Sequence, residues 1–219
     1  GDVYKRQVGH TVQGLKNWSD RDILMAWLFF LVCFYMSCRA GDILSTRVNT
    51  ATNKVLWWSN VTFDHPGGRV VIFLRSPKSS VGNKGQSVVL SKNPEANLCP
   101  VRHLQKLKQV SDIKGPVFVY DSGKFLTPQS VNFILRHASI SSGVLGNSQF
   151  SCHSLRAGLP TMMALNPGRF SQTEIRAAGR WRSDTASRYV RCQLKSANNL
   201  ARKVYQLEQT FSGHSQPPS

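Results

Sequence analysis

The chain has 219 residues, 41% of them apolar, which is enough to bury a sizeable core as one large domain or two small ones. Its 28 Lys and Arg residues outnumber its 11 Asp and Glu residues, so the formal net charge is +17 and the pI is about 10.3. This excess excludes an ordinary neutral surface and favours a polyanionic partner, with nucleic acid first and an anionic membrane second. Because the basic residues are spread along the whole chain, we expect a folded basic face and not a basic arm.

The five cysteines are odd in number and widely spaced, with no Cys-x-x-Cys pair. This pattern argues against a disulfide framework and against a zinc site, and it is typical of a reducing, intracellular compartment. The longest apolar run, Ile23 to Met36, is shorter than the ~20 residues that a membrane span needs, so it predicts a buried helix. No secretory signal is visible, and we expect no membrane partner.

The domain organisation is predicted to be simple. Residues 1–7 look unrelated to the rest of the chain and resemble a translated adaptor sequence, so they are interpreted as a non-native leader. Residues 8–219 are expected to form a single domain, with a disordered Ser- and Pro-ended tail over about 209–219.

The first predicted helix begins with Ser19 as its N-cap and Asp22 as a capping partner, and it ends near Ser37. It is apolar on nearly every face, which indicates burial all round. Arg39 follows directly, where a charge is costly unless it is paired or binds an anion. Asp42 is close enough for a surface ion pair of little worth, so the local sequence leaves both interpretations of Arg39 open.

A small antiparallel sheet is predicted in the next part of the chain. Residues 54–59, 69–74 and 86–90 are rich in β-branched and aromatic side chains, and 64–68 has the composition of a turn. The last two strands are joined by a Gly-rich loop over 76–85. This loop carries two lysines, Lys78 and Lys84.

The remaining chain is predicted to be mostly helical, with one short strand over 117–120. Gly179 is interpreted as the C′ residue of one of these helices, and Pro160 as a bend within another. Helices are predicted over 100–110, from Thr127, around His153 and Arg156, from Ser171 with Glu174 as its capping partner, from Ser183 or Asp184 with Tyr189 on it, and over 200–207.

The chemistry-bearing residues are concentrated between Cys152 and Arg191. A tyrosine hydroxyl has a pKa near 10 and is a poor nucleophile at neutral pH, but nearby cations favour the phenolate. One guanidinium can donate two parallel hydrogen bonds to two oxygens of a phosphate, and an indole N–H can donate to the same phosphate. The sequence therefore predicts attack by Tyr189 on a phosphodiester held by His153, Arg156 and Trp181.

These residues resemble the catalytic domain of the tyrosine recombinases, the phage-integrase and Cre-like superfamily, which shares its chemistry with type IB topoisomerases. The signature of that family is an arginine after a buried helix, a hairpin lysine, His-x-x-Arg, a histidine or tryptophan, and then tyrosine. The matching residues here are Arg39, Lys78 with Lys84 as the alternative, His153, Arg156, Trp181 and Tyr189, with Asp42 as the acidic residue that supports the first arginine.

The resemblance implies an α+β fold, mainly α, with a small three-stranded antiparallel sheet. It implies strand cleavage through a 3′-phosphotyrosine without metal, ATP or another cofactor, and a double-stranded DNA partner. Further DNA-binding candidates are Lys84, Arg180, Arg182 and Arg188. The family's N-terminal core-binding domain is not recognisable in this sequence.

The resemblance also implies a monomer when free and a tetramer on DNA, assembled through the C-terminal segment over 200–207. The sequence around Gly179-Arg180-Trp181 is similar to that of recombinases from Crypton- and DIRS-like mobile elements. An origin in a eukaryotic mobile element implies a nuclear location, and any other origin implies the cytoplasm or nucleoid. Two alternatives stay open: a type IB topoisomerase-like DNA relaxase, and a basic DNA-binding module without catalysis.

Overall fold

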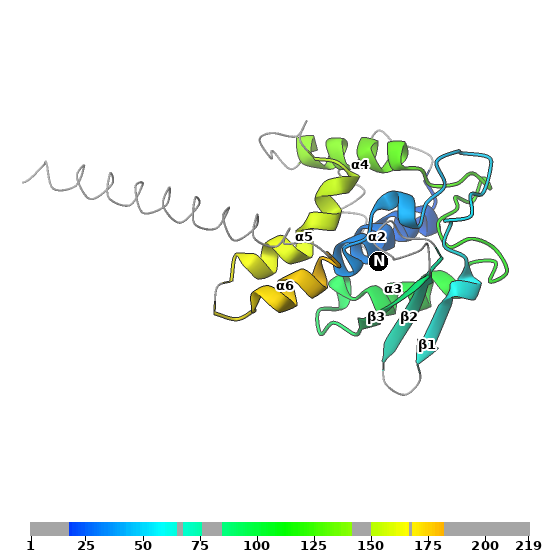
Figure 1. The fold of residues 1–219 in the computed structure, drawn as a ribbon. Coiled ribbons are helices and arrows are strands. Elements are labelled where there is room, and N and C mark those ends of the chain that lie inside the picture. The colour runs from blue at the N-terminus through cyan, green and yellow to red at the C-terminus, as the bar shows by residue number, and fades with distance from the viewer. Residues whose placement is uncertain (1–17, 65–67, 76–84, 142–149, 167, 182–219) are drawn as a thin grey trace, which may run out of the picture. The chain divides into compact units, whose positions relative to one another are not determined.

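The structure is a computed structural model that describes residues 18–64, 68–75, 85–141, 150–166 and 168–181 (Figure 1). The described residues form five α-helices and one three-stranded antiparallel sheet, joined by short 3-10 helices. This is the mainly helical α+β architecture that the sequence predicts. The chain divides into two compact units, residues 1–159 and 160–219. The predicted leader and C-terminal tail lie outside the described residues.

Helix α2, Asp20–Met36, is the central element of the first unit. Its start is the predicted one, because the Ser19 Oγ accepts from the backbone N of Asp22 at 3.1 Å. Met25, Leu28 and Phe29 are fully buried, as expected for a helix that is apolar on every face.

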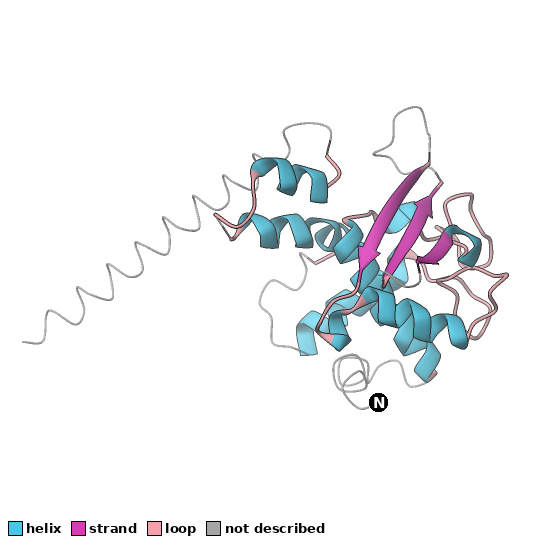
Figure 2. Cartoon of the chain, turned by 90° about the horizontal axis from the view of Figure 1, so that it is seen from below, coloured by secondary structure: helices cyan, strands magenta, loops and turns pink. Residues whose placement is uncertain are grey.

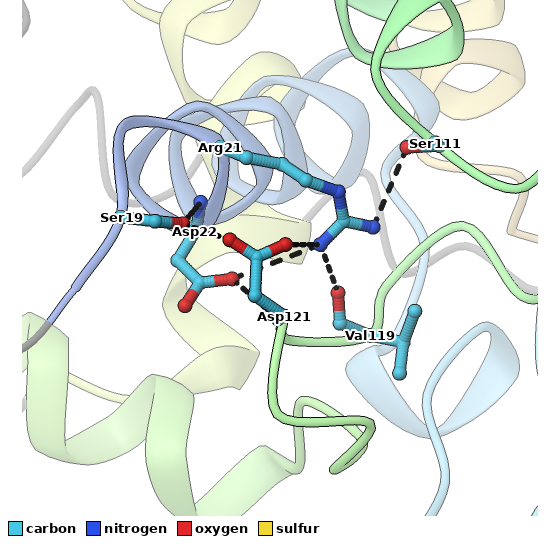
Figure 3. Close-up of polar contacts among 6 residues, drawn as sticks. All are labelled: Ser19, Arg21, Asp22, Ser111, Val119 and Asp121. Atoms are coloured by element: carbon cyan, nitrogen blue, oxygen red, sulfur yellow. Dashed lines mark hydrogen bonds and ion pairs between the residues drawn. The ribbon is translucent and has the colours of Figure 1, made fainter.

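The N-terminal end of α2 is tied to residues far along the chain (Figure 3). One nitrogen of Arg21 donates to the carbonyl of Val119 at 2.8 Å and to the carboxylate of Asp121 at 3.0 Å. The backbone N of Asp121 donates to Asp22 Oδ1 at 3.0 Å, and Ser19 Oγ also hydrogen-bonds to the Asp121 carboxylate. Asp22 thus pairs with a distant loop and not only with its own helix end.

The sheet has the order β1–β2–β3, with β1 at Val61–Asp64, β2 at Arg69–Leu74 and β3 at Gln86–Ser91. Both pairings are antiparallel, with Asp64 opposite Arg69 and Leu74 opposite Gln86. The buried side chains of β2 alternate along the strand and join the core formed with α2 and α3, Pro100–Gln109. Figure 2 shows the strands beside these helices.

The first predicted strand is wrong in position. Residues 54–59 do not form a strand of the sheet: Trp58–Asn60 is a 3-10 helix, and the strand is displaced to Val61–Asp64. Val55, Leu56 and Trp58 of this run are instead buried, and its backbone bonds to the predicted strand over 117–120, where Val117 N donates to the Leu56 carbonyl at 2.9 Å. The segment over 117–120, predicted as a strand, forms only an isolated β-bridge in the described structure, between Val119 and Phe125. The partner of β2 must directly precede the turn, so the hairpin uses residues 61–64.

Three more helices complete the described chain: α4, Pro128–Ser141; α5, Cys152–Ala164; and α6, Gln172–Ala178. The predicted caps are confirmed, since Ser130 N donates to Thr127 Oγ1 at 3.2 Å and Ser171 with Glu174 forms a complete capping box. Pro160 lies inside α5, as predicted. The predicted helices after residue 182 lie outside the described residues.

Candidate functional site

Arg39 stands at the turn that ends α2. Ser37 closes the helix in the left-handed conformation, with φ 45°, and its N–H donates to the Phe34 carbonyl. Cys38 is buried, and Arg39 then returns to an extended conformation before the 3-10 helix Ala40–Asp42. A left-handed residue other than glycine carries backbone strain, so the direction in which Arg39 leaves α2 is imposed by the surrounding packing.

Asp42 holds the backbone of Arg39. Its Oδ2 accepts from the Arg39 backbone N at 3.1 Å, while the Asp42 N–H donates to the Arg39 carbonyl at 2.8 Å. Asp42 is only 3% exposed, so the interpretation of these two residues as a surface ion pair is wrong. Nη1 of Arg39 is buried and has no hydrogen-bond partner among the described residues. A desolvated guanidinium nitrogen with a free donor favours an anionic ligand.

His153 and Arg156 lie in the first turns of α5, which α4 positions. The backbone N of Cys152 donates to Asn132 Oδ1 at 2.8 Å, and its Sγ lies 3.4 Å from the Pro128 carbonyl. His153 is exposed, whereas Arg156 is 5% exposed. The two side chains are three residues apart, one turn along the helix, so the predicted His-x-x-Arg pair combines an accessible imidazole with a desolvated guanidinium.

Helix α5 crosses α2 close to the Arg39 turn. Burial raises the pKa of the Cys33 thiol well above its usual value, and Cys38, Cys152 and Asp42 nearby add to this effect. Cys38 Sγ is 3.8 Å from Cys33 Sγ. Cys33 on α2 therefore lies near the first residue of α5 and near Cys38 and Asp42, which stand on either side of Arg39 in the sequence. Within the first unit, Asp42 and the first residue of α5 thus lie near the same part of α2.

Trp181 follows α6 in the second unit, after a complete Schellman motif. Trp181 N donates to the Arg176 carbonyl at 3.1 Å and Arg180 N donates to the Ala177 carbonyl at 3.0 Å. The left-handed residue is Arg180, with φ 50°, so the prediction of Gly179 as the C′ residue is wrong. Gly179 has φ −73°, and a Cβ on it would lie 2.5 Å from the Trp181 ring. The glycine leaves room for the indole.

Five predicted site residues lie outside the described residues: Lys78, Lys84, Arg182, Arg188 and Tyr189. Within the described ranges, no group of three or more His, Cys, Asp or Glu side chains is placed to hold a metal ion. In the same part of the chain, no helix is both long and apolar enough to cross a membrane.

Comparison with known proteins finds similar structures but no similar sequence family. No family model matches the sequence, and no curated protein matches it. The solved structures that match include the XerH site-specific recombinase bound to its difH substrate in a pre-cleavage complex, with a TM-score of 0.57 at 15% identity, and the XerA recombinase, with a TM-score of 0.54 at 17% identity.

The chain has a tyrosine recombinase-like fold. The match covers 90% of this chain and 51% of XerH, and 92% of this chain and 62% of XerA, so the chain spans less than two thirds of either recombinase.

The recombinase-like fold also contains residues that the site prediction omits. Gly158 and Gly179 each leave space for an aromatic ring, and Ser37 takes the left-handed turn before Arg39. Gly158 carries a signal in the sequence, because a glycine inside a helical pattern costs stability and usually has a packing reason. Ser37 carries none, since serine does not mark a left-handed position.

Proposed function

We propose that this chain is the catalytic part of a site-specific DNA recombinase that cuts and rejoins strands through a 3′-phosphotyrosine. The observation that supports the proposal is the tyrosine recombinase-like fold, in which Asp42, whose carboxylate accepts from the Arg39 backbone N, and Cys152, the residue before His153, lie near the same residue of α2, Cys33. The net charge of +17 supports a DNA partner, and the XerH neighbour is a recombinase bound to its DNA substrate.

In this mechanism the Tyr189 hydroxyl loses its proton to solvent, because the nearby cations favour the phenolate. The phenolate oxygen attacks phosphorus, the bond from phosphorus to the 5′-oxygen breaks, and the 5′-oxygen takes a proton from Lys78. Arg39 and Arg156 bind the non-bridging oxygens, on which negative charge grows, and His153 and Trp181 donate to the same phosphate. Because two guanidiniums stabilise that charge, the reaction requires no metal ion. Because the phosphotyrosine ester conserves the energy of the broken bond, rejoining requires no ATP. A 5′-hydroxyl of another strand reverses the step and completes the exchange.

The DNA is bound mainly through its phosphates by a basic face that includes Arg180, Arg182 and Arg188. Binding by this domain is therefore weak and steeply salt-dependent. The protein is a monomer when free, assembles as a tetramer on DNA through residues 200–207, and acts in the compartment that holds its DNA. The similarity of the Gly179-Arg180-Trp181 sequence to mobile-element recombinases supports a natural role in the movement of a mobile element.

The decisive test is the covalent adduct. Wild type and Tyr189→Phe are incubated with a nicked suicide duplex made from the DNA that flanks the gene, and with supercoiled plasmid in parallel, in the presence of EDTA. We expect an adduct on a denaturing gel with wild type alone. Arg39→Ala and Arg156→Ala should each lower its rate by roughly 10²–10³-fold. Absence of any adduct favours a DNA-binding module, and equal adduct from Tyr189→Phe means that another residue is the nucleophile.

Two further arms refine the assignment. A substrate with a 5′-phosphorothiolate needs no general acid, so it should rescue Lys78→Ala but not Arg156→Ala. Rescue of Lys84→Ala instead moves the acid to that lysine. Relaxation of supercoiled plasmid without exchange between two duplexes indicates the topoisomerase-like activity.

A further inference from the structure

Gly158 on α5 lies in close contact with Phe34 on α2. A Cβ on Gly158 would lie 2.5 Å from Cδ2 and 2.7 Å from Cε2 of Phe34, whereas ordinary van der Waals contact begins at 3.4 Å. The side chain of any other residue would therefore push the ring or the helix by about 1 Å. Glycine costs a helix interior stability, so its presence here has a packing cause.

The contact lies on the face of α5 that meets the core. Cys152 and Leu155 pack against the core cluster, and Gly158 follows Leu155 by three residues, on the same helical stripe. Arg156 adjoins this stripe and is 5% exposed. A displacement of α5 away from α2 at Gly158 therefore moves Arg156 with it.

The ring of Phe34 is itself held in place. It makes an edge contact with the ring of Tyr35, with centroids 5.3 Å apart, and the Tyr35 hydroxyl accepts from Asn93 Nδ2 at 2.7 Å. The Phe34 carbonyl accepts from the N–H of Ser37, the turn residue that precedes Arg39. Phe34 thus connects the α5 contact to the turn that carries the first arginine, and it cannot swing aside without breaking other contacts.

From this geometry we infer that Gly158 and Phe34 are positioning residues, which set the distance between the Arg39 turn and Arg156. The inference rests on the proposed function, in which both guanidiniums bind one phosphate. A pair of fixed donors loses its advantage when one moves by about 1 Å, because catalysis depends on the position of the developing charge. A methyl group at Gly158 should therefore slow the chemical step more than it weakens DNA binding.

The test compares Gly158→Ala, Phe34→Leu and the double variant in the adduct assay with the suicide duplex and the supercoiled plasmid. We expect Gly158→Ala to form adduct roughly 10–100-fold more slowly than wild type. Its affinity for the same DNA, measured in the non-cleaving Tyr189→Phe background, should stay within about threefold. Phe34→Leu makes room for the methyl, so the double variant should regain at least about tenfold over Gly158→Ala.

The outcomes separate two failures. If wild type forms adduct and Gly158→Ala does so at the same rate, or the double variant is no faster than Gly158→Ala, the positioning role is wrong and the proposed function stands. If wild type forms no adduct, the proposed function fails and the inference falls with it. Should Gly158→Ala not fold, the double variant is compared with Phe34→Leu: similar adduct rates support the inference, and a loss of tenfold or more overturns it.

Discussion

Arg180, and not the preceding Gly179, holds the left-handed position that closes α6. Arg180 has φ 50° and Gly179 has φ −73°, within the right-handed region. The glycine is next to the position where its conformational freedom would be most useful. Its lack of a Cβ instead gives space to the Trp181 ring.

The left-handed conformation of Arg180 predicts that glycine stabilises this position more than alanine, the reverse of their order in a helix interior. Both Arg180→Gly and Arg180→Ala remove the side chain, so their difference reports the backbone alone. An L-residue pays about 1–2 kcal/mol in this region, and glycine's greater freedom when unfolded takes back part of that. We expect Arg180→Gly to be more stable than Arg180→Ala by about 0.5–1 kcal/mol in urea unfolding. The opposite order, as in a helix interior, contradicts a left-handed Arg180.

Gly179→Ala should displace Trp181. The added methyl meets the indole at 2.5 Å, and overpacking of this size costs about 1–3 kcal/mol. Adduct formation should fall as well, because Trp181 is a proposed phosphate ligand. Gly41→Ala is the matched control for the unfolding measurement, since a Cβ there would meet nothing within 4 Å. Equal unfolding free energies for the two variants would argue against the Gly179–Trp181 contact.

Two substitutions of Asp42 distinguish the role of its hydrogen-bond acceptor from that of its negative charge. Its carboxylate accepts from the Arg39 backbone N at 3.1 Å, and an asparagine keeps an acceptor at that place. Asp42→Ala should lose about 1 kcal/mol or more and slow adduct formation, whereas Asp42→Asn should lie closer to wild type in both measurements. If the two variants are equally impaired, the negative charge of Asp42 matters more than its hydrogen bond.

His103 predicts a dependence of stability on pH. It is fully buried, with Nδ1–H donating to the Cys99 carbonyl at 2.7 Å. Burial lowers the pKa of His103 below 6.5, although the bond to Cys99 opposes this. The unfolded chain then binds the proton more readily, so the stabilisation is complete above about pH 6.5 and is lost as the pH falls through the folded-state pKa.

His103→Asn keeps a donor to Cys99 without a group that titrates. The difference in unfolding free energy between wild type and this variant should shrink on acidification, by at most about 1.4 kcal/mol per pH unit. Urea unfolding at about pH 5 and about pH 7.5 measures it. A difference that does not change with pH would mean that His103 has the same pKa in both states.

Substitutions of Arg21 and Asp121 at the start of α2 distinguish how much a hydrogen bond and an ion pair each contribute to stability. The side chain of Arg21 is 15% exposed and also holds the Val119 carbonyl, whereas Asp121 is 46% exposed. Arg21→Ala should cost about 1–2 kcal/mol and Asp121→Ala less, because an exposed ion pair contributes about 0–1 kcal/mol. A double-mutant cycle should give a coupling below about 1 kcal/mol, and a larger value would assign the anchor to the ion pair.

Much of this architecture follows from signals within short stretches of sequence. The cap at Ser19 and the apolar faces after it delimit α2, and the capping box of Ser171 with Glu174 starts α6. The run of β-branched and aromatic residues over 69–74 gives β2 its predicted bounds. Each of these signals acts over one or two turns or one strand, where the local backbone preference and the tertiary structure agree. The order of Arg39, His153 and Arg156 along the chain likewise predicts the proposed chemistry from the sequence, through its resemblance to the tyrosine recombinases.

Tertiary packing alone decided the rest. The run over 54–59 has strand propensity, yet it is buried against residues 115–117 because β2 pairs with the residues nearest its turn. The anchor from Arg21 to Asp121 and the close approach of Gly158 to Phe34 join segments about 100 residues or more apart. Composition and periodicity predict that a surface is buried, but not which surface meets it. The distance between the two arginine-bearing elements is set by that choice of partners, since close-packed side chains leave few ways for two helices to cross.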